Sequence, residues 1–160
     1  MPEVYSFDSD SFIAPWRGFY RPEFIPDFWD SLDGLIREGR LKVAEPVYEE
    51  ILQGGDELSE WFEARKQAIL YPWDITVQQA VREIQQKHPN IVKSTGKSGA
   101  DPWVVAVAKA MGGCVVTFEK KSGADARHIK IPNVCESFSI RCMTVYEVIA
   151  EEEWVFGRLR

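Results

Sequence analysis

Two aspartates follow directly on a short apolar run near the start of the chain. The segment VYSFDSDSFI places Asp8 and Asp10 after residues 3–7, which have the composition of a buried strand. An ionised carboxylate at the end of a buried strand has to be hydrogen-bonded, ion-paired or bound to a metal, because moving an unpaired charge out of water is costly. We therefore expect partners for these carboxylates elsewhere in the chain.

Further carboxylates stand at the ends of other predicted elements. Glu49 and Glu50 lie in the first turns of a helix expected after LKVAEP, and Asp101 begins the segment DPWVVAVAKAMGG. Glu119 follows the apolar run CVVTF. Carboxylate oxygens are the ligands that Mg²⁺ and Mn²⁺ prefer, and such ions lower the pKa of a bound water and stabilise charge on a phosphodiester. If these acids converge, the pattern indicates phosphodiester hydrolysis.

Each of these acids also has a purely structural interpretation. Asp101 before a proline is a common helix start, and Glu119 in FEKKSG fits a turn residue. Glu49 and Glu50 fit a solvated helix face, and Asp8 fits a cap for the turn that leaves the first strand. The signal is the arrangement of several acids rather than any one of them.

The elements that would position these acids alternate along the chain. Strands are predicted at residues 3–7, in LKVAEP, in CVVTF, near Ile129 and in SIRCM. Helices are predicted for about a dozen residues from Pro26 and over 47–52, 56–70, 75–88, 101–113, 132–138 and 144–154, whereas APWRGFYRPEF (14–24) reads as a loop. This alternation predicts a parallel α/β sheet, in which sites form at the carboxyl ends of the strands.

Composition sets further limits. A chain of 160 residues with 45% hydrophobic and 28% charged residues fits one globular domain over 1–160. The net charge of −6 and the pI near 5.0 argue against a protein that coats nucleic acid by charge alone, but not against an enzyme that holds it through metal ions.

Cysteine usage and the N-terminal segment favour the cytoplasm. Cys114, Cys135 and Cys142 lack the neighbours of a zinc site, and we expect them to be reduced core residues. His88 and His128 have no partner at metal-ligand spacing. The segment MPEVYSF has no signal-peptide features and no stretch is apolar enough to span a membrane, so a cytoplasmic location and no membrane contact are expected.

Several motifs resemble those of PIN domains. YSFDSDSFI resembles their opening hydrophobic-Asp-x-Asn/Asp motif, VYEEILQG their second acidic motif, and GADPWVVAVAKAMGGCVVTFEK the third and fourth together. The resemblance covers residues 4–149 and is closest to small prokaryotic PIN-like proteins that also carry segments like FYRPEFIPDFW, DELSEWF and IPNVCESFSIRCM. It implies a three-layer α/β/α sandwich with a central, mainly parallel sheet, and a metal-dependent ribonuclease, the toxin of a type II toxin–antitoxin pair in many relatives.

The resemblance also implies roles for individual residues. The catalytic and metal-binding set, for Mg²⁺ or Mn²⁺, is Asp8, Glu50, Asp101 and Glu119, with Asp10 and Thr117 supporting them. Basic residues expected to contact the RNA backbone are Lys93, Lys97, Lys120, Lys121, Arg17 and Arg21. Glu119 stands where relatives usually carry Asp, and Val47 where many carry Thr or Ser. Possible partners are an antitoxin with a helix-turn-helix domain and a second copy of the chain.

Two alternatives stay open. FDSDS also resembles the Asp-x-Asp motif of haloacid-dehalogenase-type phosphatases, in which Asp8 would be the nucleophile and Asp10 the acid/base, although the later motifs of that family are poorly matched. The chain could instead be a catalytically weak PIN-like binding module whose site has decayed through Glu119 and Val47.

Overall fold

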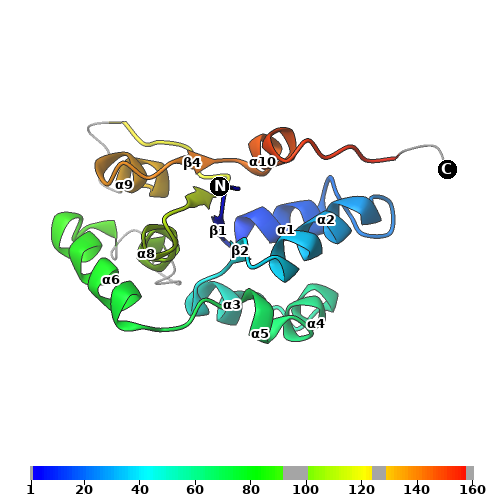
Figure 1. Cartoon of the computed structure of the whole chain (residues 1–160), viewed down its shortest axis with the longest axis horizontal. Coiled ribbons are helices and arrows are strands. Elements are labelled where there is room, and N and C mark those ends of the chain that lie inside the picture. Colours follow the sequence, from blue (N-terminus) through cyan, green and yellow to red (C-terminus); the bar gives the residue numbers. More distant parts are fainter. Residues whose placement is uncertain (1, 92–100, 124–128, 158–160) are drawn as a thin grey trace.

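A four-stranded parallel sheet lies at the centre of the protein (Figure 1). The computed structural model describes residues 2–91, 101–123 and 129–157. The strands are β1 (Tyr5–Phe7), β2 (Leu41–Lys42), β3 (Cys114–Val116) and β4 (Cys142–Met143), in the order β2-β1-β3-β4, and every pairing is parallel. The predicted parallel α/β sheet is confirmed.

Helices cover both faces of this sheet. They are α1 (Asp10–Arg17), α2 (Pro26–Arg37), α3 (Glu45–Leu52), α4 (Glu57–Glu63), α5 (Lys66–Ile69), α6 (Ile75–Lys87), α8 (Asp101–Met111), α9 (Ile131–Ser137) and α10 (Val145–Glu151). In Figure 1, α8 and α6 lie on one side of the strands and α1 and α2 on the other. The buried side chains form one hydrophobic cluster, and the predicted three-layer α/β/α arrangement is confirmed.

Polar caps fix where several of these helices begin. Asp56 accepts a hydrogen bond from the amide of Ser59 (3.1 Å) before α4, and Asp74 accepts one from the amide of Val77 (2.9 Å) before α6. The first amides of a helix have no partner within it, so a side-chain oxygen at this position stabilises the start. These caps fix the residues at which α4 and α6 begin.

The strand register decides which residues meet at the carboxyl edge of the sheet. Phe7 pairs with Val116, and Val116 with Met143. The amide of Asp8 donates to the carbonyl of Val116 (2.9 Å) and the amide of Thr117 to that of Met143 (3.0 Å). Asp8 and Thr117 therefore leave their strands side by side, at the edge where α/β proteins place their sites.

The turn into β3 requires glycine. A Cβ atom on Gly113 would lie 2.3 Å from the carbonyl oxygen of Val4, closer than real contacts allow. The amide of Cys114 donates to that same carbonyl (3.0 Å). The absence of a side chain at Gly113 lets β3 start directly against the residue before β1.

Three local predictions were wrong. Residues 14–24 were expected to be a loop, yet α1 extends to Arg17 and contains Pro15, because burial of Phe12 and Pro15 stabilises this helix despite the lost hydrogen bond.

The single helix expected over 56–70 is divided into α4 and α5. The division lets the Arg65 side chain bind Asp33 of α2 (2.7 Å). No strand occurs near Ile129 in the described segment 129–130, which leads directly into α9.

The state of the cysteines and the length of the helices bear on what was expected from composition. Cys114 and Cys135 are buried, Cys142 is half-buried, and all are free thiols. Among the described residues, no helix is both long and apolar enough to cross a bilayer.

Candidate functional site

Asp8 lies at the point where β1 ends, and its side chain is 6% exposed. Its Oδ2 accepts a hydrogen bond from the Thr117 hydroxyl (3.0 Å), and its Oδ1 accepts one from the backbone amide of Ser9 (2.9 Å). The carboxylate is thus fixed from two sides. One of the donors comes from the neighbouring strand.

Asp10 begins α1 and shares one of its hydrogen-bond partners, Thr117, with Asp8. The Thr117 hydroxyl lies 3.2 Å from Asp10 Oδ2, and the amide of Phe118 donates to the same oxygen at 3.2 Å. The Ser11 hydroxyl donates to Oδ1 at 3.1 Å. A hydroxyl has one proton to donate, so Thr117 can satisfy only one carboxylate at a time. Two acidic side chains therefore meet around a single hydroxyl oxygen.

Burial raises the pKa of Asp10 above its ordinary value, and the negative charge of Glu119 raises it further. Hydrogen bonds from Phe118, Ser11 and Thr117 act in the opposite direction without cancelling the effect of burial. The ionised form of Asp10 is accordingly disfavoured in the metal-free protein. A cation at this edge would relieve that penalty.

The side chain of Glu119 is turned towards α9. Its Oε2 accepts a hydrogen bond from the amide of Ile131 (3.0 Å), the first residue of α9, and its Oε1 lies 3.9 Å from Lys130 Nζ. Its backbone amide donates to the Thr117 hydroxyl (3.1 Å). Glu119 is therefore connected to Asp8 and Asp10 through Thr117, while its carboxylate binds the start of a helix.

The remaining predicted acids come from α3 and α8. Glu50 is half-buried and Glu49 is exposed, so α3 turns the first of these inward and the second towards solvent. Asp101 is the first residue of α8, and its side chain lies outside the described part of the structure. The metal-binding roles of Glu50 and Asp101 stay predictions.

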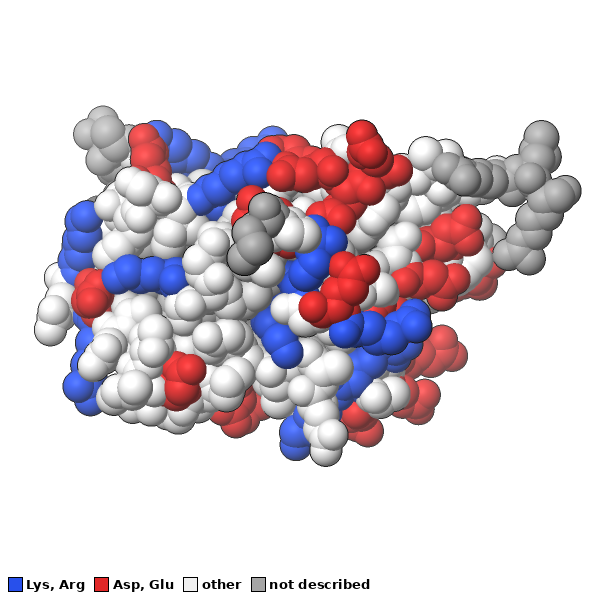
Figure 2. Space-filling model, in the orientation of Figure 1, with Lys and Arg blue, Asp and Glu red and all other residues white. Residues whose placement is uncertain are grey.

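The basic residues predicted to bind RNA are spread over several places. Lys93 and Lys97 lie outside the described residues. Lys120 is exposed, and Lys121 forms an ion pair with Glu136 (2.5 Å). On the face shown in Figure 2, Lys and Arg side chains lie among Asp and Glu side chains rather than forming one continuous basic surface.

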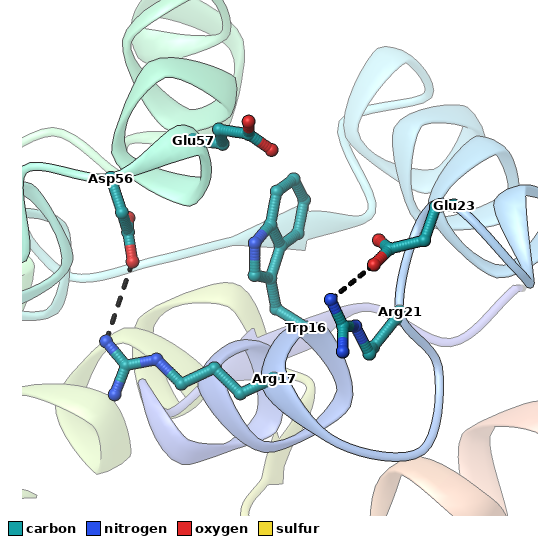
Figure 3. Close-up of a pocket in the computed structure, with 6 residues that line it drawn as sticks. All are labelled: Trp16, Arg17, Arg21, Glu23, Asp56 and Glu57. Carbon is teal, nitrogen blue, oxygen red and sulfur yellow. Dashed lines mark ion pairs between the residues drawn. The ribbon is translucent and has the colours of Figure 1, made fainter.

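Arg17 and Arg21 line a depression between the end of α1 and the start of α4 (Figure 3). Its volume is about 640 Å³, and Trp16, Glu23, Asp56 and Glu57 complete its lining. Arg17 pairs with Asp56 (3.5 Å) and Arg21 with Glu23 (2.5 Å). Both arginines are therefore partly neutralised by acidic neighbours.

A smaller depression adjoins the carboxylates themselves. Its volume is about 200 Å³, and it lies between the ends of β3 and β4 and the starts of α9 and α10. Thr117, Glu119, Lys121, Pro132 and Glu147 are among the residues that line it. The strand ends thus open onto solvent beside the acidic residues.

The donor set at this edge consists of oxygen atoms, which suits a hard divalent cation such as Mg²⁺. Asp8 and Asp10 supply carboxylates and Thr117 supplies the hydroxyl that links them. Within the described ranges, no group of three or more His, Cys, Asp and Glu side chains is arranged to hold a metal ion. The described donors therefore match a divalent cation in chemical type, and Asp8 is the predicted metal ligand among them.

Ser11 was not predicted to belong to the site. It is fully buried, and its hydroxyl lies within hydrogen-bonding distance of both Asp10 Oδ1 (3.1 Å) and the carbonyl of Val116 (3.2 Å). The serine directly after Asp10 in FDSDS was the available signal, because a serine hydroxyl can donate a hydrogen bond to a neighbouring carboxylate.

Comparison with known proteins supports the fold. The chain matches the model of a family described as Domain of unknown function (DUF4411) over residues 5–156. It is similar to the structure of VapBC-1 from nontypeable Haemophilus influenzae, with a TM-score of 0.51, 15% identity, and coverage of 87% of this chain and 96% of that chain.

A second solved structure shows the same similarity. VapBC2 from Rickettsia felis, bound to a DNA fragment from its promoter, gives a TM-score of 0.50 at 10% identity, covering 88% of this chain and 98% of that chain. At these identities the similarity establishes a shared fold. No curated protein matches the chain.

Proposed function

The chain belongs to the DUF4411 family. From its fold, which is similar to that of the VapBC structures, and from its site we propose that residues 1–160 form one PIN-like domain that acts as a metal-dependent endoribonuclease. The observation that carries this proposal is the Thr117 hydroxyl, which lies 3.0 Å from Asp8 and 3.2 Å from Asp10 at the carboxyl edge of a parallel sheet. Two acids around one oxygen suit a cation-dependent reaction better than a structural cap, which needs only one carboxylate.

The side chains act by position and charge. Asp8, Glu50 and Asp101 would hold Mg²⁺ or Mn²⁺, and Glu119 is proposed as the fourth acidic position. The cation supplies Lewis-acid stabilisation of the charge that develops on the phosphodiester. Thr117 holds Asp8 and Asp10 in place from the next strand, and burial of Asp8 keeps this carboxylate in a fixed orientation.

The solved relatives suggest a biological setting. Both are VapBC complexes, and one of them is bound to promoter DNA. We propose by analogy that this chain is the toxin of a toxin–antitoxin pair, with an antitoxin that carries a helix-turn-helix domain as its partner. An adjacent gene for a small DNA-binding protein that co-purifies with the chain would support this setting.

The side chain of Glu119 favours one other function. Because its carboxylate binds the amide of Ile131, it is engaged in structure, as expected of a binding module with a weakened site. Such a module would bind its antitoxin and show neither Mn²⁺ binding nor RNA cleavage.

The test is cleavage of a fluorescently labelled RNA by the purified protein in Mg²⁺ or Mn²⁺ and in excess chelator. We expect cleavage in metal and none in chelator. Asp8→Asn should lower the rate by at least about a hundredfold, the upper end of the loss seen when residues around a metal are changed. Circular dichroism should show an unchanged fold.

Asp30→Asn, at an exposed position on α2, is the matched control and should cleave like the parent. Cleavage that continues in chelator would contradict the proposal. Hydrolysis of phosphomonoesters but not of RNA, abolished by Asp10→Asn, would identify a phosphatase instead.

A further inference from the structure

Three aromatic side chains from distant segments meet on the surface. Phe19 lies between α1 and α2, Phe118 follows β3, and Tyr146 is in α10. The ring centroid of Phe19 lies 5.8 Å from that of Phe118 and 5.6 Å from that of Tyr146, and Phe118 and Tyr146 are 5.6 Å apart. We call these three residues the aromatic triangle.

The aromatic triangle is accessible to solvent. Phe19 is 42% exposed, Tyr146 is 53% exposed, and Phe118 is half-buried between them. Single exposed apolar residues are common on protein surfaces and need no explanation. A contact among three rings from separate segments is different, because each ring restricts the motion of the other two and so forms a preorganised surface.

The aromatic triangle adjoins the carboxylates. Phe118 directly follows Thr117, and its own amide donates to Asp10 at 3.2 Å. The backbone that holds one ring of the triangle therefore also holds the acidic site. A ligand whose phosphate lies at the acids would bring its neighbouring groups over these rings.

The overall charge limits how a nucleic acid can be bound here. The chain carries a net charge of −6, and acidic and basic side chains are mixed on the face in Figure 2. A basic surface that attracts phosphates supplies most sequence-independent binding, and the face in Figure 2 does not present such a surface. Stacking of bases on aromatic rings does not depend on net charge, and every base has a face that can stack.

We propose that Phe19, Phe118 and Tyr146 form a stacking platform for bases of single-stranded RNA next to the phosphate that is cleaved. This proposal rests on the function proposed above and specifies its substrate class. Bases inside a duplex are already stacked on their neighbours, so the platform selects single strands, loops or ends.

The experiment measures binding without cleavage. A fluorescein-labelled 2′-O-methyl oligonucleotide, which resists hydrolysis, is titrated with the parent protein in chelator, and fluorescence anisotropy gives the Kd. We expect Phe19→Ala and Tyr146→Ala each to weaken binding about tenfold, within the range for one base–aromatic stack. An abasic version of the probe and a duplex version should both bind poorly to the parent.

Phe24→Ala is the matched control. Phe24 belongs to the same segment as Phe19 and is 74% exposed, and it lies beside the Arg21 guanidinium (5.7 Å) rather than in the aromatic triangle. This variant should bind the probe like the parent. Phe118 is left unchanged, because it directly follows Thr117 and its backbone amide binds Asp10.

Several results would overturn the platform: no binding of the probe by the parent, equal binding of the abasic probe, or parent-like binding by Phe19→Ala and Tyr146→Ala. Loss of a dimer in these variants with unchanged probe affinity, measured by light scattering, would reassign the surface to a protein contact. A parent that binds the probe through these rings but cleaves no RNA in Mn²⁺ would leave the platform standing and refute the ribonuclease. A parent that cleaves RNA while the variants bind the probe normally would support the ribonuclease and refute the platform.

Discussion

The two edges of the sheet differ in the partners that hold their acidic side chains. At the amino edge, Arg40 stands directly before β2 and binds both carboxylate oxygens of Glu152, one of them at 3.0 Å. The Tyr5 hydroxyl donates to the same glutamate at 2.5 Å. Arg141, directly before β4, donates to Glu151 at 2.9 Å. Negative charge at this edge is matched by arginine from within the chain.

At the carboxyl edge the described donors to Asp10 are neutral: the Thr117 and Ser11 hydroxyls and the Phe118 amide. Neutral donors orient a carboxylate without cancelling its charge. The difference teaches that the arginines at the amino edge compensate the charge of their carboxylates, whereas the donors to Asp10 orient its carboxylate and leave its charge in place, as the proposed cation-dependent function requires. Substitutions at the two edges should therefore separate activity from stability.

Among the variants that test this comparison, the largest effect is expected from Glu50→Gln. Glu50 is half-buried on α3 and Glu49 is exposed, since adjacent helical residues point about 100° apart. Loss of the cation ligand proposed above should reduce single-turnover RNA cleavage by about a hundredfold. Glu49→Gln is the control and should retain most activity. If Glu49→Gln lost more activity than Glu50→Gln, Glu49 and not Glu50 would be the acid of the second motif.

At the amino edge we expect the reverse behaviour from Arg40→Met. The Arg40 and Glu152 side chains are 17% and 14% exposed, so removing the guanidinium leaves a largely buried carboxylate without its charge partner. Urea denaturation should show a free energy of unfolding lower by about 2 kcal/mol, less than for a fully buried pair. Cleavage measured well below the transition should be unchanged.

Arg141→Met provides the comparison for that variant. Arg141 also precedes a strand, but it is 54% exposed and its ion pair with Glu151 is open to solvent. Exposed pairs contribute little, so this variant should unfold close to the parent. An equal decrease in the free energy of unfolding for the two arginine variants would show that the burial of the ion pair does not determine its contribution to stability.

A smaller effect, and one that depends on pH, is expected from Asp10→Asn in chelator. The folded state raises the pKa of Asp10, mainly through burial, so it binds this proton more tightly than the unfolded chain does. The parent should therefore lose stability as pH rises from about the ordinary value of 3.8 through the folded pKa, and the variant lacks this loss. The Tm of Asp10→Asn relative to the parent should increase with pH over this window. A constant difference would contradict a raised pKa.

The smallest effect is expected at Cys114. Burial raises the pKa of Cys114 to about 12, so almost no thiolate is present at neutral pH. Alkylation of Cys114 by iodoacetamide in native buffer should be slow, as followed by mass spectrometry, and RNA cleavage should not change. Rapid loss of RNA cleavage on alkylation would contradict this and indicate a reactive thiol at the carboxyl edge of the sheet.

The sheet was predictable because its signals are local. Apolar runs such as CVVTF, with glycines before them, identify β3, and Asp8 at the end of β1 follows from the same pattern. The partners of Glu119 were not predictable, because its bond to Ile131 depends on where α9 begins in space. The aromatic triangle was hidden for the same reason: its rings are adjacent only in the folded protein.

The link between Thr117 and Asp8 also bears on how the protein is made. The two residues are 109 positions apart in the chain, and the strands that carry them are neighbours in the sheet. Contacts between such distant segments form late, because a long loop must close first. During translation, β1 leaves the ribosome long before β3 exists to pair with it. The paired carboxylates are therefore completed only after residues 114–117 have emerged, so this edge can have no activity before that point of synthesis.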